Sequence, residues 1–190
     1  PWSIRVDSDA VLVRFADQTV RAVPYDLPVI GYGTKHIGNL RLWQAEPLSS
    51  FDFNEFNDQH YEASVREKNR AEDISRVLYP NDSTDEGKKL RLKQQYFFCC
   101  ASLQDMIKNY KLVHGNDFSH FADFNAIQLN DTHPVISIPE LIRQLTRYEG
   151  VSFDDALNIA KKTFAYTNHT ILPEALEKWN KHLLIEVVPD

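Results

Sequence analysis

Two short polar segments carry the side chains of this sequence that are best suited to chemistry. The first, NDTH at residues 130–133, follows the apolar run 124–129, and the second is TNHT at residues 167–170. Asparagine, aspartate and histidine together offer hydrogen-bond donors and acceptors in fixed directions, as a ligand with many hydroxyl groups requires. The two segments therefore indicate a site for a polar ligand such as a sugar.

The same residue types also have a purely structural interpretation. Asn130 and Asp131 could form Asx turns or cap a following helix, while His133 and His169 could make hydrogen bonds within the scaffold. The residues alone leave both interpretations open. A metal site built from Asp131 and His133 is disfavoured because two ligands are too few, so we expect no metal.

A third polar segment, YPNDSTDE at residues 79–86, also lies between two expected helices. In open α/β sheets, ligands bind beyond the carboxyl ends of strands, where loops enter helices. The NDTH segment has this position, because a short buried strand at 124–129 precedes it and a helix from Ser137 or Pro139 follows it.

The remaining pattern predicts the elements that must hold these loops. Alternating apolar residues predict strands in VLVRF, TVRAV and LRLWQA within residues 11–45. The stretch 31–38 between them has neither the GxGxxG spacing nor a Gly-Lys-Ser/Thr ending, so it predicts a turn and not a phosphate loop.

Helical periodicity accounts for most of the rest of the chain. It predicts a strongly charged helix at 60–77, a long buried helix at about 90–111, a helix that Ser152 and Asp155 open as a capping box and that runs to Phe164, and a last helix at 173–179. The sequence thus indicates a mixed α/β fold.

Composition limits the partners and the compartment. The net charge is −6 and the pI about 5.6, which argues against nucleic acid or an anionic membrane as the main partner, and no apolar run reaches the length of a membrane span. The only cysteines, Cys99 and Cys100, are adjacent in one predicted helix and are expected to be reduced, which fits the cytosol. The chain begins at Pro1, so we expect a fragment whose leader could be missing.

Seven blocks of the sequence, in order, carry a family resemblance: VPYDLPVIGY, LRLWQAE, ISRVLYPND, EGKKLRLKQQYF, IQLNDTHP, IPELIR and FAYTNHTILPEALEKW. Together they make the chain resemble the α-glucan phosphorylases, the glycogen and maltodextrin phosphorylase family. The resemblance implies an α/β fold of the glycosyltransferase-B type, in which two Rossmann-like domains face each other. Residues 1–190 would form a single segment of the N-terminal domain.

The resemblance also implies an activity. Inorganic phosphate would attack the non-reducing end of an α-1,4-glucan, glycogen or maltodextrin, and release α-D-glucose 1-phosphate. Family members use pyridoxal phosphate, bound to a lysine of the C-terminal domain, and no block here matches that lysine motif. We therefore expect no cofactor-binding residue in this chain and no activity from it alone. The alternative is a non-catalytic carbohydrate-binding or scaffold domain.

The family's site residues carry over onto the polar segments. His169 matches the histidine that hydrogen-bonds the transferred glucosyl unit, and Asp131 and His133 match residues that shape the donor and acceptor subsites. Tyr79 matches a tyrosine that packs against the acceptor sugar. Asn81 and Asp82 lie in the family's mobile gating loop.

The chain departs from the family at two places. Ser83, Thr84 and Asp85 replace an asparagine and aromatic residues, which predicts weaker sugar contact. Lys108 and Asn109 replace an arginine pair that serves nucleotide activation in animal enzymes, so we expect no control by AMP. The charged helix near 60–75 matches the family's protruding helix, which implies a homodimer. Preference for glycogen or maltodextrin stays open.

Overall fold

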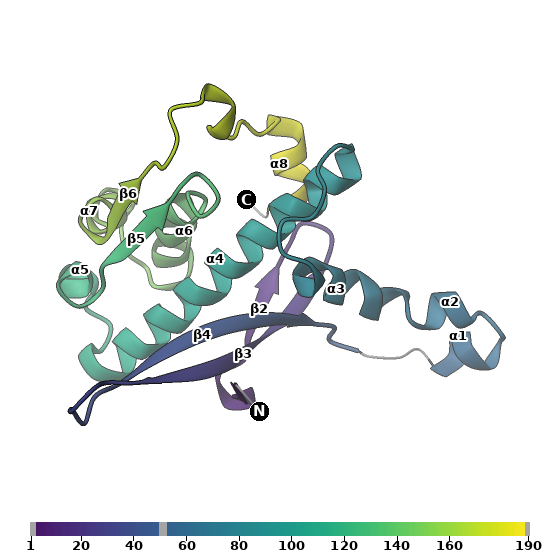
Figure 1. The fold of residues 1–190 in the computed structure, drawn as a ribbon, viewed down its shortest axis with the longest axis horizontal. Coiled ribbons are helices and arrows are strands. Elements are labelled where there is room, and N and C mark those ends of the chain that lie inside the picture. The colour runs from purple at the N-terminus through teal and green to yellow at the C-terminus, as the bar shows by residue number, and fades with distance from the viewer. Residues whose placement is uncertain (1–2, 50–52, 189–190) are drawn as a thin grey trace. The chain divides into compact units, whose positions relative to one another are not determined.

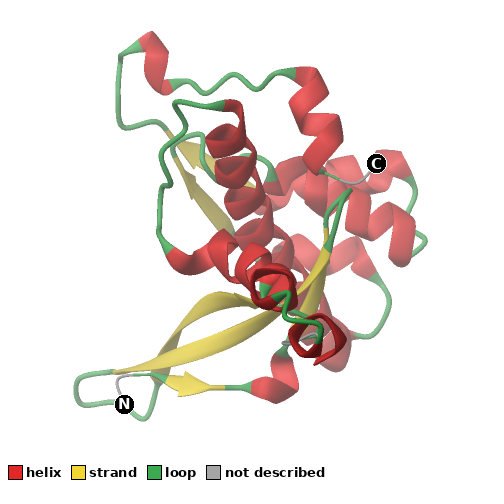
Figure 2. Ribbon diagram, turned by 90° about the vertical axis from the view of Figure 1, so that its right-hand side faces the viewer, coloured by secondary structure: helices red, strands yellow, loops and turns green. Residues whose placement is uncertain are grey.

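The computed structural model describes residues 3–49 and 53–188, which divide into two compact units. Unit 1 comprises the chain up to Phe97 together with the segment from Ile185 onward, and unit 2 comprises Phe98–Leu184. The content is mixed helix and strand, as the sequence predicts (Figures 1 and 2).

The strands of unit 1 form an antiparallel sheet around one long central strand. The strand β3 (Thr19–Ile30) pairs along one edge with β1 (Ile4–Arg5) and β2 (Val11–Arg14), and along the other with β4 (Ile37–Glu46). The turn predicted at 31–38 joins β3 to β4, although β4 already begins at Ile37. Alternation places one set of side chains in the core, which confirms the strand pattern: Val13, Val20, Ala22, Trp43 and Ala45.

The charged segment that follows forms short helices, not one continuous helix. The helix α1 spans Phe53–Asn57, α2 spans Tyr61–Ser64 and α3 spans Arg66–Arg76, with a break at Val65. Only two side chains of α3, Ala71 and Ile74, are buried, so most of its charged surface faces solvent. The hydroxyl of Ser75 accepts a 2.9 Å hydrogen bond from the Ala45 N–H, which ties α3 to β4.

The helix α4 (Asp85–His114) is the longest element, and its two parts belong to the two units. It begins after Thr84, whose hydroxyl accepts a 3.1 Å hydrogen bond from the Gly87 N–H as an N-cap does. The predicted apolar stripe is confirmed, since these side chains are buried: Leu92, Tyr96, Leu103, Ile107 and Tyr110.

Unit 2 places a parallel pair of strands beside helices. The strands β5 (Ile127–Asn130) and β6 (Phe164–Thr167) pair in parallel, and the chain between them forms α6 (Ser137–Tyr148) and α7 (Phe153–Thr163). A 3-10 helix, η2 (Phe118–His120), and α5 (Phe121–Phe124) precede β5. The core joins four helices through Leu103, Ile107, Phe121, Leu141, Leu145, Ala156 and Ile159.

The predicted capping box before α7 is confirmed. The Ser152 hydroxyl accepts a 3.2 Å hydrogen bond from the Asp155 N–H, so it satisfies a donor that the first turn leaves open. Phe153, the first residue of α7, is 62% exposed.

Two further predictions of secondary structure were wrong. Residues after α7 do not simply form a loop, because Phe164–Thr167 pair with β5 as β6. The predicted helix at 173–179 is only the 3-10 turn η3 (Pro173–Ala175), since the backbone is extended at Leu176. A separate helix, α8 (Lys181–Val187), follows, and the Asn180 side chain accepts a 2.9 Å hydrogen bond from the His182 N–H at its start.

Candidate functional site

The NDTH segment leaves the end of β5 through a left-handed backbone turn. Asp131 has φ +61°, a conformation that aspartate and asparagine adopt more readily than most residues. Its N–H donates a 2.9 Å hydrogen bond to the Thr167 carbonyl, which extends the β5–β6 pairing by one residue. The backbone of Asp131 is therefore fixed where the two strands end.

The side chain of Asp131 brings the second polar segment to the first. Its Oδ1 accepts a 3.0 Å hydrogen bond from the N–H of His169. The neighbours of His169 close a small turn, because Asn168 Oδ1 accepts from the Thr170 N–H at 3.3 Å and Asn168 Nδ2 donates to the Thr170 carbonyl at 2.7 Å. The backbone of His169 is thereby held while its side chain stays exposed.

Thr132 and His133 face Glu177, a residue that sequence reasoning missed. The Thr132 hydroxyl lies 3.3 Å from the Ala175 carbonyl and 3.4 Å from Glu177 Oε2, and His133 Nδ1 lies 3.7 Å from Glu177 Oε1. Glu177 was expected within a regular helix, and its side chain is only 17% exposed. The extended backbone after η3 is what turns this carboxylate towards His133.

The far end of the NDTH segment is held by the start of α6. The Pro134 carbonyl accepts hydrogen bonds from the Ser137 hydroxyl at 2.5 Å and the Ser137 N–H at 2.9 Å, and the Cys99 thiol lies 3.7 Å away. Burial, together with the Glu140 carboxylate, raises the pKa of the Cys99 thiol to about 12. Cys99 is thus neutral, as expected for a free packing cysteine.

The Tyr79 segment in unit 1 also begins with a left-handed residue. Tyr79 has φ +55°, the residue is 57% exposed, and its N–H donates a 3.0 Å hydrogen bond to Oε1 of Gln94 on α4. Gln94, which sequence reasoning also missed, is only 4% exposed. A glutamine within the buried stripe of a helix was the available signal.

Asn81 and Asp82 follow Tyr79 and lie against the first turns of α4. Asn81 Oδ1 accepts from the Ser83 N–H at 2.8 Å, and Asp82 Oδ2 pairs with Arg91 Nη1 at 3.1 Å. Gly87 permits this approach, since a Cβ there would lie 2.1 Å from the Asn81 carbonyl oxygen. Both side chains are exposed at the loop surface.

The predicted site residues thus fall into two groups, one in each unit. Asp131, His133 and His169 belong to unit 2, and the structure joins Asp131 directly to His169. Tyr79, Asn81 and Asp82 belong to unit 1.

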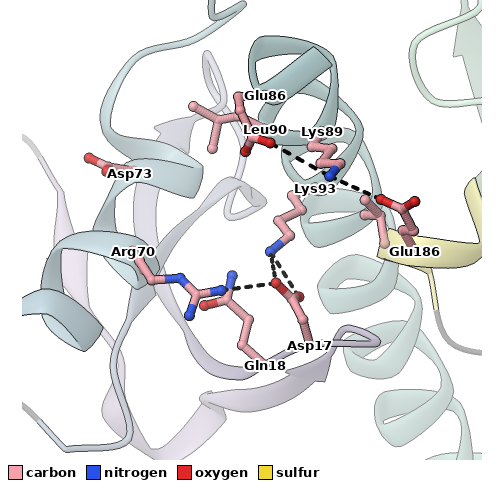
Figure 3. A pocket seen from close by; sticks show the side chains of 10 residues that line it. Asp17, Gln18, Arg70, Asp73, Glu86, Lys89, Leu90, Lys93 and Glu186 are labelled. Atoms are coloured by element: carbon pink, nitrogen blue, oxygen red, sulfur yellow. Dashed lines mark hydrogen bonds and ion pairs between the residues drawn. The ribbon is translucent and has the colours of Figure 1, made fainter. Parts of the chain in front are cut away.

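A separate polar hollow of about 520 Å³ lies within unit 1 (Figure 3). Asp17 receives Lys93 at 2.7 Å and Arg70 at 2.9 Å, and Lys89 pairs with Glu186 at 2.9 Å. Each cation of the hollow already has a carboxylate partner. Little charge is left for an external ligand, so we do not regard this hollow as the candidate site.

Among residues 3–49 and 53–188, no group of three or more histidine, cysteine or acidic side chains could hold a metal ion. No helix in these same ranges is both long and apolar enough to cross a membrane.

The sequence is similar to those of known carbohydrate phosphorylases. The family model described as carbohydrate phosphorylase matches residues 5–190. Over 90% of its length, the chain is 51% identical to the glycogen phosphorylase of Saccharomyces cerevisiae and 49% identical to the H isozyme of α-glucan phosphorylase from Solanum tuberosum. Over 97% of its length it is 48% identical to the brain form of glycogen phosphorylase from Bos taurus.

The chain belongs to the carbohydrate phosphorylase family. It is an α-glucan phosphorylase sequence that covers 19%, 21% and 23% of these three relatives, about a fifth of their length.

Proposed function

We propose that this chain is part of an enzyme that transfers glucosyl units from the non-reducing end of an α-1,4-glucan to inorganic phosphate. The product is α-D-glucose 1-phosphate, with retained configuration. The observation that carries the proposal is the family match over residues 5–190, in a chain whose two polar segments meet at the Asp131–His169 hydrogen bond. Glycogen and maltodextrin are both candidate substrates.

His169 is proposed to contact the glucosyl unit that is transferred. Its backbone is held by Asp131, which leaves an exposed imidazole that can donate to, or accept from, a sugar hydroxyl. His133 is proposed to shape the neighbouring subsites together with Asp131. With the backbone of His169 held, its imidazole can stabilise the transition state with little reorganisation during the reaction.

Tyr79, Asn81 and Asp82 are proposed to contact the acceptor sugar and gate the site. The exposed ring of Tyr79 offers the apolar surface on which a sugar face packs. Closure of such a loop would exclude water, which would otherwise hydrolyse the bond that phosphate should cleave. The Thr84 hydroxyl accepts from the Gly87 N–H of α4, and neither Ser83 nor Thr84 offers an aromatic surface, so weaker sugar contact is proposed here than in relatives with aromatic residues.

Pyridoxal phosphate is proposed as the cofactor of the complete protein, where its phosphate group supplies proton transfer. The two lysines of the polar hollow in unit 1 do not fit it. Lys93 is only 12% exposed, but it is held by Asp17 at 2.7 Å, and Lys89 is held by Glu186. The cofactor site is therefore proposed to lie outside this chain, and the chain alone to be inactive.

A homodimer in the cytoplasm is also proposed, with the helices near residues 60–75 as the contact. Here α2 and α3 expose most of their surface, and the rings of Phe56 and Tyr61 pack together at 5.0 Å while remaining exposed, as surfaces for a partner often do. The net charge of −6 gives no support to a nucleic-acid partner.

The test is a product assay on the complete protein. Purified protein with bound pyridoxal phosphate is incubated with maltoheptaose and inorganic phosphate, and the sugar products are separated. We expect glucose 1-phosphate. Free glucose in its place would indicate a hydrolase, and maltoheptaose binding with no product would support the non-catalytic alternative.

A further inference from the structure

The side chain of Gln94 binds three main-chain groups, one in the last turn of α3 and two in the segment that joins α3 to α4. Figure 1 shows the course of this segment between the two helices. Its Nε2 donates to the carbonyls of Ile74 and Val77, each at 2.9 Å, and its Oε1 accepts from the Tyr79 N–H at 3.0 Å. Both donors and the acceptor of the amide are thus used on backbone, in a side chain that is 4% exposed.

The backbone at these positions needs such partners. The helix α3 ends at Arg76 and Val77 is extended, so the last carbonyls of α3 have no partner in a next turn. Tyr79 has a left-handed backbone, which is strained for a residue with a Cβ and persists only where neighbouring structure enforces it. Gln94 donates to the carbonyls at the end of α3 and also binds the N–H of the left-handed Tyr79.

The rest of the loop lies along the same face of α4. Gly87 allows the Asn81 carbonyl to approach, Arg91 pairs with Asp82, and Gln94 binds Tyr79. The three helix positions are spaced four and three residues apart, so they lie on one helix face. Gln94 is the only one of the three that is buried.

We propose that Gln94 is a positioning residue for phosphorolysis, which sets the backbone of Tyr79 and thereby the presentation of the 79–82 loop to the acceptor glucan. This proposal rests on the proposed function of Tyr79 as a sugar contact. Glutamine suits the role because asparagine is one methylene shorter, glutamate would place a carboxylate against two carbonyl oxygens, and methionine has the length without the polar atoms.

The test compares two methionine substitutions in the complete protein. Gln94→Met removes the three bonds, while Gln144→Met removes an equally buried amide of α6 that contacts Cys100 and Glu140. The readouts are the Kd of maltoheptaose, the KM values for glucan and phosphate, the melting temperature, and hydrogen exchange of the peptide covering residues 77–84.

We expect Gln94→Met to speed exchange of this peptide and to weaken maltoheptaose binding and raise the glucan KM about tenfold, the effect of losing one or two backbone hydrogen bonds. The phosphate KM should stay unchanged. Both substitutions should lower the melting temperature by a similar amount, but Gln144→Met should leave maltoheptaose binding unchanged.

Three results would overturn the proposal: unchanged maltoheptaose binding in Gln94→Met, an equal loss in Gln144→Met, or a Tyr79 amide that exchanges freely in the wild type. The exchange rate of the Tyr79 amide in the wild type tests the proposal even if Gln94→Met does not fold. If the wild type releases no glucose 1-phosphate, the proposed function fails, and the maltoheptaose Kd still decides the role of Gln94.

Discussion

Replacing Asp131 separates three properties of this residue: its negative charge, its acceptor oxygen and its tolerance of a left-handed backbone. Asp131→Asn keeps the acceptor and the tolerance, Asp131→Gly keeps only the tolerance, and Asp131→Ala keeps none of them. Because the wild-type residue has φ +61° and accepts from the His169 N–H at 3.0 Å, the three variants should form a series.

The size of each step follows from the contacts. A hydrogen bond to a charged group contributes about 1.5–3 kcal/mol, and the lower end applies because Asp131 is only half-buried and His169 is exposed. The glycine variant should therefore lose about 1.5 kcal/mol, or about tenfold in kcat/KM. Alanine adds about 1–2 kcal/mol of backbone cost and should approach a hundredfold loss, while asparagine should stay within about fivefold.

The assay measures glucose 1-phosphate release by the complete protein, with hydrogen exchange of the peptide covering residues 164–172 beside it. Exchange at His169 should rise in the order asparagine, glycine, alanine. A glycine variant as active as wild type would refute the reasoning. An asparagine variant as damaged as alanine would also refute it, because the charge of Asp131 would then act on a ligand directly.

Three other predictions concern stability and reactivity. Gly87→Ala should destabilise the protein by about 1–3 kcal/mol and loosen the loop at residues 79–84 in hydrogen exchange, because its Cβ would meet the Asn81 carbonyl oxygen at 2.1 Å and this clash outweighs the helix preference of alanine. Unchanged melting and exchange would contradict this. The pKa of the Cys99 thiol is raised to about 12, so Cys99 should resist alkylation by iodoacetamide at pH 7–9, and rapid alkylation at pH 8 would refute the burial argument. Between about pH 9 and 12 the folded state keeps a thiol proton that the unfolded state releases, so the stability of the protein should fall as the pH rises through this range. Arg41 holds the pKa of Asp26 below its usual value, so this ion pair stabilises the fold above about pH 4, and its contribution disappears as the pH falls through the folded pKa. Arg41→Met should therefore lower the melting temperature at pH 7 and lower it less at pH 3. An equal drop at both pH values would argue against a stabilising role of the pair.

The sequence was informative where a pattern is local. The NDTH segment was predicted to follow a short strand, and a strand does end at its first residue, Asn130, because apolar runs and turn residues determine short elements through near neighbours. The predicted bounds and burial of this strand were wrong, since β5 begins at Ile127 and only Leu129 in it is buried. The Ser152 capping box and the apolar stripe of α4 were confirmed for the same reason.

The contacts between distant segments could not be predicted in this way. The bond from Asp131 to His169 depends on the parallel pairing of β5 with β6, and β6 follows α7 without any turn residue that would announce it. Glu177 was assigned to a helix because Pro173 suits a first turn, but only a 3-10 turn forms there. Long-range pairing, and not local preference, decides both.

The most direct test of the account is the replacement of His169 in the complete protein. Release of glucose 1-phosphate from glycogen and phosphate is compared for His169→Ala and for His182→Ala, which removes another exposed histidine at the start of α8. We predict a loss of about a hundredfold or more in kcat for His169→Ala, as for other positioned donors, and wild-type rates for His182→Ala. Equal rates for His169→Ala and the wild type would contradict the account.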